Sequence, residues 1–283
     1  MMKISKVGVV GGGTMGNGIA QVCATSGLSV MMLDIDQESL DRGLGAISSS
    51  LERLVRKDQL SVNDRELAMQ RIQTTTDYTD LADVDLVIEA ASEVEKVKLS
   101  IISTLDKIVR KDTIIASNTS SMSITLLAAA SSAPNRVIGM HFFNPVPVMM
   151  LVELIRGLQT DDSTQQAAES FVKQINKTAI SVKNSAGFAV NRILVPMINE
   201  SVFVLQEGVA SAKDIDDGMR LGCNHVIGPL ALADLIGLDT LLSVMEVFYR
   251  SYNDPKYRPA PLLREMVEAG YLGRKSGQGF YAY

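Results

Sequence analysis

Short runs of apolar residues alternate with longer stretches of helical periodicity up to about residue 183. The runs that we assign as strands lie at 7–10, immediately before Asp34, and at 85–90, 113–116, 136–140, 151–155 and 179–182. Nearly continuous apolar runs are typical of parallel strands that helices cover on both faces. The pattern therefore predicts an α/β domain with a doubly wound sheet of the Rossmann type.

The pattern changes at about Asn184. Long helical stripes replace the alternation of strands and helices, and turn residues such as Gly208 and Pro229 separate them. We therefore predict two domains, an α/β domain over residues 1–183 and an all-helical domain over 184–283. A chain of 283 residues is long enough for both.

A glycine-rich turn follows the first strand and opens the first helix. In the sequence Gly11-Gly12-Gly13-Thr14-Met15-Gly16, the first glycine permits a tight turn and Gly13 lets the backbone approach a pyrophosphate. Gly16 lets the helix pack close to the sheet. Because the N-terminus of a helix offers N–H groups and a positive dipole end to phosphates, we predict dinucleotide binding here.

An acid stands where the second strand ends. Asp34 comes 18 residues after Gly16, close to the position from which a carboxylate accepts the ribose hydroxyls. The same charge repels the extra phosphate of NADP, so NAD is favoured. The uncharged run before Asp34 also resembles a targeting segment or membrane span, but its many glycines and polar residues argue against both.

Two helices are predicted between the second strand and the next apolar run. They form a hairpin over about 37–72, in which Ser61 and Asp64 resemble a capping box and the second helix continues through Ile72. On the pattern alone, its cations are typical of a solvated helix face, and the alternative is that they meet an anionic substrate. These cations are Arg53, Arg56 and Lys57.

Polar residues follow two of the central strands. Glu93 lies just past 85–90, and the small polar residues 117–121 follow 113–116. Open α/β sheets bind ligands at the carboxyl ends of their strands, so we interpret both segments as a ligand-facing rim. The helix between them is expected to bury a stripe made of Val97, Ile101, Leu105 and Ile108.

A histidine ends the run 136–140. His141 is one of two histidines in the chain, and a neutral imidazole at this edge of the sheet is well suited to accept a hydroxyl proton near pH 7. Glu153 lies within the next, otherwise apolar strand, where a carboxylate is rarely buried without a partner. We therefore predict a catalytic pair of His141 and Glu153, and a structural role for His225.

Composition narrows the class of protein. A hydrophobic content of 46% and a charged content of 21% are typical of a globular enzyme, and the net charge of −5 gives no reason to expect nucleic acid or an anionic membrane as a partner. The two cysteines, with no export signal, indicate reduced thiols in the cytoplasm. No cysteine and histidine pairs have metal-ligand spacing, so we expect no metal.

The whole chain resembles the short-chain L-3-hydroxyacyl-CoA dehydrogenase family, and within it the bacterial 3-hydroxybutyryl-CoA dehydrogenases. The segments that carry the resemblance are GGGTMGNGIAQ, LVIEAASE, ASNTSSMSIT, GMHFFNPVPVM, GFAVNRILVPMINE, GLD and GRKSGQGFYAY. The resemblance implies that the chain interconverts (S)-3-hydroxybutyryl-CoA and acetoacetyl-CoA, or related short-chain thioesters, with NAD. It also implies a homo-oligomer, typically a dimer formed through the helical domain.

The resemblance assigns roles to individual residues. It implies His141 as the catalytic base, Glu153 as its acidic partner, and Ser120 and Asn191 as substrate contacts. It implies coenzyme A contacts at Ser50 and Lys57, which reverses the reading of the hairpin from its pattern alone. The implied NAD contacts are the glycine turn, Asp34, Glu93, Lys98, Ser120, Asn144 and Lys275.

Three positions depart from the pattern of the family. Met150 replaces a common lysine, Val226 a common proline and Ala231 a common acid.

Two alternative functions remain. One alternative is an NAD-binding protein without catalytic activity, because a fold can retain ligand binding after its catalytic activity is lost. The other is a β-hydroxyacid dehydrogenase that acts on free acids with a catalytic lysine, against which His141 and the hairpin argue.

Overall fold

The computed structural model describes residues 4–283, which form two compact units. The first unit ends at Ser185, and the second spans Ala186–Tyr283. An α/β unit is followed by a helical unit, so the predicted fold class is confirmed.

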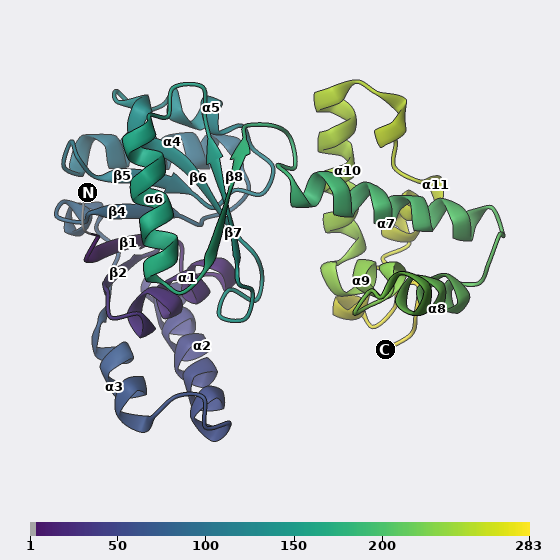
Figure 1. Ribbon diagram of the computed structural model, residues 1–283, viewed down its shortest axis with the longest axis horizontal. Coiled ribbons are helices and arrows are strands. Elements are labelled where there is room, and N and C mark those ends of the chain that lie inside the picture. Colours follow the sequence, from purple (N-terminus) through teal and green to yellow (C-terminus); the bar gives the residue numbers. More distant parts are fainter. Residues whose placement is uncertain (1–3) are drawn as a thin grey trace. The chain divides into compact units, whose positions relative to one another are not determined.

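The first unit is built on an eight-stranded sheet with the order β3-β2-β1-β4-β5-β6-β7-β8 (Figure 1). Neighbouring strands are parallel except β6 and β7, which pair antiparallel. The sheet therefore has the doubly wound order around β1 and β4, followed by a reversed pair at one edge. The strands are β1 (Lys6–Val10), β2 (Ser29–Leu33), β3 (Ile72–Thr75), β4 (Leu86–Glu89), β5 (Ile114–Ser117), β6 (Val137–Phe142), β7 (Leu151–Arg156) and β8 (Thr178–Lys183).

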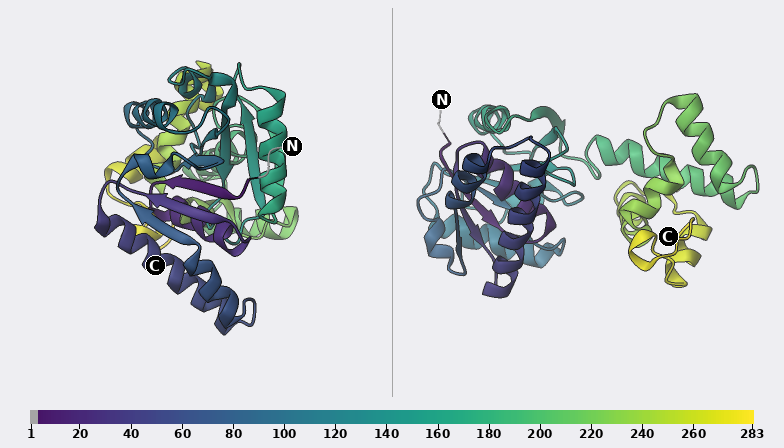
Figure 2. Two further views of the ribbon diagram at one scale, coloured as in Figure 1. Left: turned by 90° about the vertical axis from the view of Figure 1, so that its left-hand side faces the viewer. Right: turned by 90° about the horizontal axis from the view of Figure 1, so that it is seen from below.

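Helices cover both faces of this sheet (Figure 2), and each face has its own apolar core. One core includes residues of α1, α2, α3 and α6, and the other includes residues of α4, α5 and η1. The helices of this unit are α1 (Thr14–Thr25), α2 (Gln37–Arg56), α3 (Val62–Gln70), η1 (Tyr78–Leu81), α4 (Glu95–Ile108), α5 (Ile124–Ala128), η2 (Pro134–Arg136) and α6 (Asp162–Gln174).

The predicted helical hairpin corresponds to α2 and α3, which extend away from the sheet in Figure 1. The Ser61 hydroxyl accepts from the Asp64 N–H at 3.0 Å, as a helix N-cap should. The second helix is shorter than predicted, because α3 ends at Gln70 and Ile72 begins β3. The edge strand β3 is therefore an element that the apolar pattern missed, since only Ile72 among its residues is buried.

The buried face of α4 also differs from the prediction. Ile101 and Leu105 are buried as expected, but Val97 is 40% exposed, and Lys98 is turned inward with 1% exposure. The helix is rotated so that a lysine occupies the face that points to the sheet. Its ion pairs, described below, explain why a charged side chain is stable there.

The second unit is built from helices around one apolar core. Phe248 and Leu230 lie at 0% exposure within that core. Within residues 4–283, no helix combines the length and apolar character needed to cross a membrane. The helices of the second unit are α7 (Val190–Gln206), α8 (Ala212–Cys223), α9 (Pro229–Ile236), α10 (Leu238–Tyr252), η3 (Pro255–Tyr257), α11 (Pro261–Glu268) and η4 (Arg274–Ser276).

Candidate active site

The glycine turn between β1 and α1 has little room for side chains. Gly11 has a φ of +105°, a backbone conformation that favours glycine. A Cβ on Gly16 would lie 1.7 Å from the carbonyl oxygen of Gly11, so α1 starts in direct contact with the turn. By contrast, a Cβ on Gly13 would have no atom within 4 Å, which leaves open space beside the start of the helix. This is the geometry that a pyrophosphate group requires.

Asp34 joins the glycine turn to the end of β2. Its Oδ2 accepts from the Gly12 N–H at 2.6 Å, and its Oδ1 accepts from the Ile35 N–H at 2.7 Å. Asp34 lines a cavity of about 720 Å³ together with Gly13, Tyr78 and Val97. Burial raises the pKa of Tyr78, and the nearby carboxylates of Asp34 and Glu89 raise it further.

This cavity fits the adenosine half of a dinucleotide. A carboxylate at its edge can accept ribose hydroxyls, and the exposed apolar side chains of Ile35 and Val97 offer contacts to a flat base. The residues present at the turn and in the cavity are therefore compatible with bound NAD.

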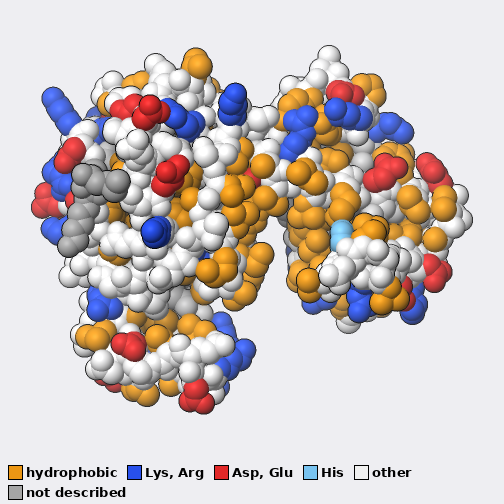
Figure 3. Space-filling model, viewed as in Figure 1, with side chains coloured by type: hydrophobic (Ala, Val, Ile, Leu, Met, Phe, Trp, Pro, Cys, Tyr) orange, Lys and Arg blue, Asp and Glu red, His pale blue; other side chains and the backbone are white. Residues whose placement is uncertain are grey.

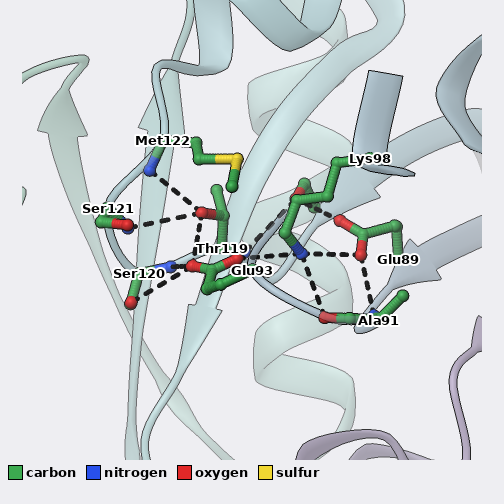
Figure 4. Close-up of polar contacts among 9 residues, drawn as sticks. Glu89, Ala91, Glu93, Lys98, Thr119, Ser120, Ser121 and Met122 are labelled. Carbon is green, nitrogen blue, oxygen red and sulfur yellow. Dashed lines mark hydrogen bonds and ion pairs between the residues drawn. The ribbon is translucent and has the colours of Figure 1, made fainter. Parts of the chain in front are cut away.

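Lys98 joins two carboxylates at the carboxyl end of the sheet (Figure 4). Its Nζ lies 2.7 Å from Oε1 of Glu89 and 3.1 Å from Oε2 of Glu93. The ammonium also donates to the carbonyl oxygen of Ala91 at 3.3 Å. Glu89 is completely buried, whereas the side chain of Glu93 is 41% exposed. One buried cation thus connects an internal carboxylate to one at the surface.

Glu93 in turn holds the loop that follows β5. Its Oε1 accepts from the backbone N–H of Ser120 at 2.7 Å, from the Ser120 hydroxyl at 3.2 Å and from the Thr119 hydroxyl at 2.7 Å (Figure 4). Thr119 Oγ1 accepts from the N–H groups of Ser121 and Met122. The structure therefore brings together Glu93, Lys98 and Ser120, three of the residues that the resemblance implies as NAD contacts.

His141 and Glu153 form a hydrogen-bonded pair. The antiparallel register of β6 and β7 places the two residues opposite each other, and His141 Nδ1 lies 2.8 Å from Glu153 Oε2. His141 is 6% exposed, Glu153 is completely buried, and the ring of Phe143 packs 4.5 Å from the imidazole. Because an ionised carboxylate only accepts, we assign the Nδ1 proton to His141.

The end of β6 is also tied to the polar segment 117–121. Asn118 Oδ1 accepts from the backbone N–H of Phe142 at 2.9 Å, and the Ser117 hydroxyl donates to Glu89 Oε2 at 2.6 Å. These two polar residues therefore cross-link neighbouring strands. All five residues read as a ligand-facing rim have hydrogen-bond partners. Ser117 and Asn118 bond to neighbouring strands, whereas Thr119 and Ser120 bond to Glu93 and Ser121 bonds within the loop.

A second cavity, of about 610 Å³, lies between α1, α2 and the loop 144–148. Ser50 and Lys57 line it together with Asn144 and Arg53. Basic side chains gather over α2 on the face shown in Figure 3. Among the described residues, Arg56 is ion-paired with Glu52 at 3.5 Å, whereas Arg53 and Lys57 form no ion pair. Two uncompensated cations one helical turn apart suit a phosphate-bearing ligand.

Lys177 fixes the loop that carries Asn144. Its Nζ donates to the carbonyl oxygens of Val146 and Met149 at 2.7 and 2.6 Å. Burial lowers the pKa of Lys177. A buried ammonium group therefore anchors the part of this loop that lines the second cavity.

Two predicted site residues lie in the second unit. Asn191 lies in the first turn of α7. Lys275 lies in η4, where its Nζ forms an ion pair with Asp239 at 2.5 Å. The segment after η4 is held by Asp234, whose carboxylate accepts from the N–H groups of Phe280 and Tyr281.

Neither Glu89 nor Arg53 was predicted from the sequence as a site residue. The signal for Glu89 was present, because it is a carboxylate in the otherwise apolar strand β4, and a carboxylate in an apolar strand is the pattern that identified Glu153. Arg53 was named as one of three cations whose pattern favoured a solvated helix face, with contact to an anionic substrate as the alternative. Its position in the second cavity depends on the fold bringing the loop 144–148 to the same cavity as α2.

Comparisons with known proteins cover the whole chain. A model of the 3-hydroxyacyl-CoA dehydrogenase NAD binding domain matches residues 6–185, and one of the 3-hydroxyacyl-CoA dehydrogenase C-terminal domain matches residues 187–283. A probable 3-hydroxybutyryl-CoA dehydrogenase of Deinococcus radiodurans is 52% identical over 98% of this chain and 100% of its own length. The 3-hydroxybutyryl-CoA dehydrogenase of Bradyrhizobium diazoefficiens is 50% identical over 99% of this chain and 96% of its own.

The same similarity holds for solved structures. The crystal structure of the (S)-3-hydroxybutyryl-CoA dehydrogenase of Ralstonia eutropha has a TM-score of 0.97 with this chain at 60% sequence identity. The match covers 99% of both chains.

Proposed function

The chain belongs to the 3-hydroxyacyl-CoA dehydrogenase family, and we propose that it interconverts (S)-3-hydroxybutyryl-CoA and acetoacetyl-CoA with NAD. The single observation that carries the mechanism is the hydrogen bond between His141 and Glu153 at the end of β6. A buried carboxylate held against an imidazole is the arrangement that supports reversible proton transfer.

Both domains of the family are present, so the chain is an NAD-dependent oxidoreductase. We propose that the glycine turn (11–16) holds the pyrophosphate and that Asp34 accepts the ribose hydroxyls. The open space at Gly13 and the cavity beside Asp34 support this placement. Further proposed contacts to the cofactor are Glu93, Lys98, Ser120, Asn144 and Lys275.

The proton steps belong to His141. The Nδ1–H group of His141 donates a hydrogen bond to Glu153, so the neutral imidazole carries its basic lone pair on Nε2. In the oxidative direction, Nε2 takes the proton of the 3-hydroxyl group as a hydride leaves C3. When bound, NAD would supply the acceptor for that hydride. In the reductive direction, the imidazolium returns its proton to the oxygen on C3, and the carboxylate of Glu153 stabilises the positive charge in the meantime.

Ser120 and Asn191 are proposed to position the substrate. The Ser120 hydroxyl and the Asn191 amide would hydrogen-bond the oxygens of the thioester substrate, holding C3 within reach of the nicotinamide. Such positioning can lower a barrier by roughly 7–11 kcal/mol. The fixed geometry of Ser120 on Glu93 supports its part in this role.

The second cavity is the proposed site of coenzyme A. Ser50 and Lys57 would contact it, and the uncompensated charges of Lys57 and Arg53 support recognition of its phosphates.

We also propose that two copies associate through the helical unit, where Ile193 and Val226 are 72% and 99% exposed. The free thiols of Cys23 and Cys223 suit a cytoplasmic location.

The proposal is tested by following NADH oxidation at 340 nm with acetoacetyl-CoA and with free acetoacetate. We expect turnover of the thioester, little or none of the free acid, and a strong preference for NADH over NADPH. Preference for the free acid would instead identify a β-hydroxyacid dehydrogenase. Tight NADH binding with no turnover of either compound would identify a non-catalytic dinucleotide-binding protein.

A further inference from the structure

Glu89 is a completely buried carboxylate for which the proposed reaction has no direct use. It ends β4, and each of its oxygens has a partner: Oε1 accepts from Lys98 and from the Ala91 N–H at 2.8 Å, and Oε2 accepts from the Ser117 hydroxyl. With 0% exposure, it is shielded by protein on every side. Its influence on a ligand must therefore pass through the residues that it contacts.

Stability alone explains this carboxylate poorly. Replacing a buried ion pair by apolar side chains of similar volume is often neutral or stabilising, because the desolvation of two charges offsets their attraction. The neighbouring residues of β4, Leu86 to Ile88, are apolar and equally buried. An apolar residue at position 89 would continue that strand without a charge.

The contacts of Glu89 lead to the proposed site in two steps. Glu89 holds the Lys98 ammonium, and the same ammonium holds Oε2 of Glu93. The other oxygen of Glu93 accepts from the N–H and the hydroxyl of Ser120 (Figure 4). The carboxylates of Glu89 and Glu93 share the single ammonium group of Lys98. The position of this ammonium group therefore sets the position of the Glu93 carboxylate.

We propose that Glu89 is a positioning residue that fixes Lys98 and, through it, the Glu93 carboxylate that orients Ser120. This inference rests on the proposed function, since it gives Glu89 a purpose in the same site. Without the charge of Glu89, Lys98 pairs with Glu93 alone and draws that carboxylate inward. The hydrogen bonds from Glu93 to Ser120 then lengthen, and the loop after β5 loses its fixed geometry.

The test is the variant Glu89→Gln, which keeps the size of the side chain and removes its charge. We expect kcat/KM for acetoacetyl-CoA to fall by roughly 10- to 100-fold, the effect of a small misplacement of positioning groups. The dissociation constant for NADH should rise as well, because Glu93 and Lys98 are proposed cofactor contacts. If Glu89→Gln does not fold, Glu89→Asp tests the geometry instead of the charge, since it keeps the charge but retracts the carboxylate from Lys98.

A matched control is available in the same unit. Asp106 and Arg136 also form a nearly buried ion pair, at 2.8 Å, with side chains 9% and 8% exposed. Asp106→Asn should lower the melting temperature and leave kcat/KM within about twofold. If Glu89→Gln changes the kinetic constants no more than Asp106→Asn does at a similar loss of stability, Glu89 is merely structural and the inference is wrong.

A double-mutant cycle with Ser120→Ala locates the effect. If Glu89 acts through Glu93 on Ser120, Glu89→Gln should cost much less in kcat/KM once Ser120 is alanine. Additive effects of the two changes would contradict this route. Wild-type protein that fails to turn over acetoacetyl-CoA would refute the proposed function instead, and the NADH dissociation constants of the wild type and Glu89→Gln would then still decide the role of Glu89.

Discussion

His141 and Glu153 face each other across two antiparallel strands, with Nδ1 of the histidine 2.8 Å from Oε2 of the glutamate. The backbone pairing of β6 and β7 sets this distance, and both residues lie within strands and not in loops. The proposed base and its partner are therefore held by the sheet itself. Such rigid support suits groups that must keep their geometry through turnover.

Replacing the imidazole tests the proposed base. In His141→Ala, we expect kcat to fall by roughly 10²–10⁴-fold, the usual contribution of general acid–base catalysis. NADH binding, measured by fluorescence titration, should remain nearly unchanged because the glycine turn is untouched. A variant with near-normal turnover would eliminate His141 as the base.

Glu153→Gln tests the role of the carboxylate. The glutamine amide matches the carboxylate in size but offers an N–H group to Nδ1, which favours the wrong tautomer of His141. We expect kcat to fall by roughly 10²–10⁴-fold, as for other carboxylates that orient a catalytic histidine. Circular dichroism should confirm that the fold persists. Turnover within threefold of wild type would show that the pair is not needed for proton transfer.

The proposed coenzyme A site predicts a difference between two neighbouring cations at the C-terminal end of α2, Arg56 and Lys57. Lys57→Met removes a charge from the second cavity and should raise KM for acetoacetyl-CoA by about tenfold, with kcat unchanged. The control is Arg56→Met, because Arg56 is paired with Glu52 and does not line the cavity. A thioester of N-acetylcysteamine lacks the nucleotide and should be insensitive to both changes. Equal effects of the two variants would argue against this placement of the phosphates.

Close packing at the glycine turn predicts a large effect of a single methyl group. In Gly16→Ala, the new Cβ would overlap the Gly11 carbonyl oxygen, so we expect a loss of roughly 3 kcal/mol or more in unfolding free energy and weak NADH binding. Gly45→Ala is the control. It lies within α2 with no atom within 4 Å of the new Cβ and should stabilise the protein by about 0.5–1 kcal/mol. Urea unfolding of both variants would check this contrast.

The N-cap of α6 predicts an acid-dependent stability. Burial alone would raise the pKa of Asp161, but hydrogen bonds from Asn135, Thr164 and Ser163 lower it to about 2, from 3.8 in the unfolded chain. The folded state therefore favours the ionised form. The resulting stability is complete above pH 4 and is lost as the pH falls through about 2.

Asp161→Asn removes this charge and keeps an acceptor for the N-cap, because asparagine is also a good N-cap. We expect the variant to be about 1–2 kcal/mol less stable than wild type at pH 6, with the difference shrinking below pH 4. Unfolding free energies measured from pH 6 to pH 2 would show this convergence. A difference that stays constant across that range would mean that the charge of Asp161 is not its cause.

Much of the fold follows from the apolar pattern, because buried parallel strands have few polar residues. The edge strand β3 does not, since three of its four residues are not buried and it starts two residues after α3 ends. The inward turn of Lys98 was also unpredictable from helical periodicity. It requires the carboxylates of Glu89 and Glu93, which come from β4 and the loop after it.

Some features of the candidate site were likewise predictable from the sequence, and others were not. The pairing of His141 with Glu153 was predictable because a single acid interrupts an apolar strand next to the one that ends in the histidine. Glu89 has an equivalent setting in β4, but its partner is a lysine on a helix, where a lysine ordinarily faces solvent. The placement of Arg53 in a cavity depends on the fold bringing a loop about ninety residues later to the same cavity as α2, which no local pattern encodes.

Asp34 has a consequence for attempts to change the cofactor. The carboxylate that we propose discriminates against a 2′-phosphate also accepts the Gly12 N–H at 2.6 Å, and so helps to shape the glycine turn. Exchanging it for alanine would remove the repulsion and orphan a backbone donor in the same step. A redesign for NADP would therefore begin with serine or asparagine at this position, which retain an acceptor. An arginine to pair with the 2′-phosphate would be added only afterwards.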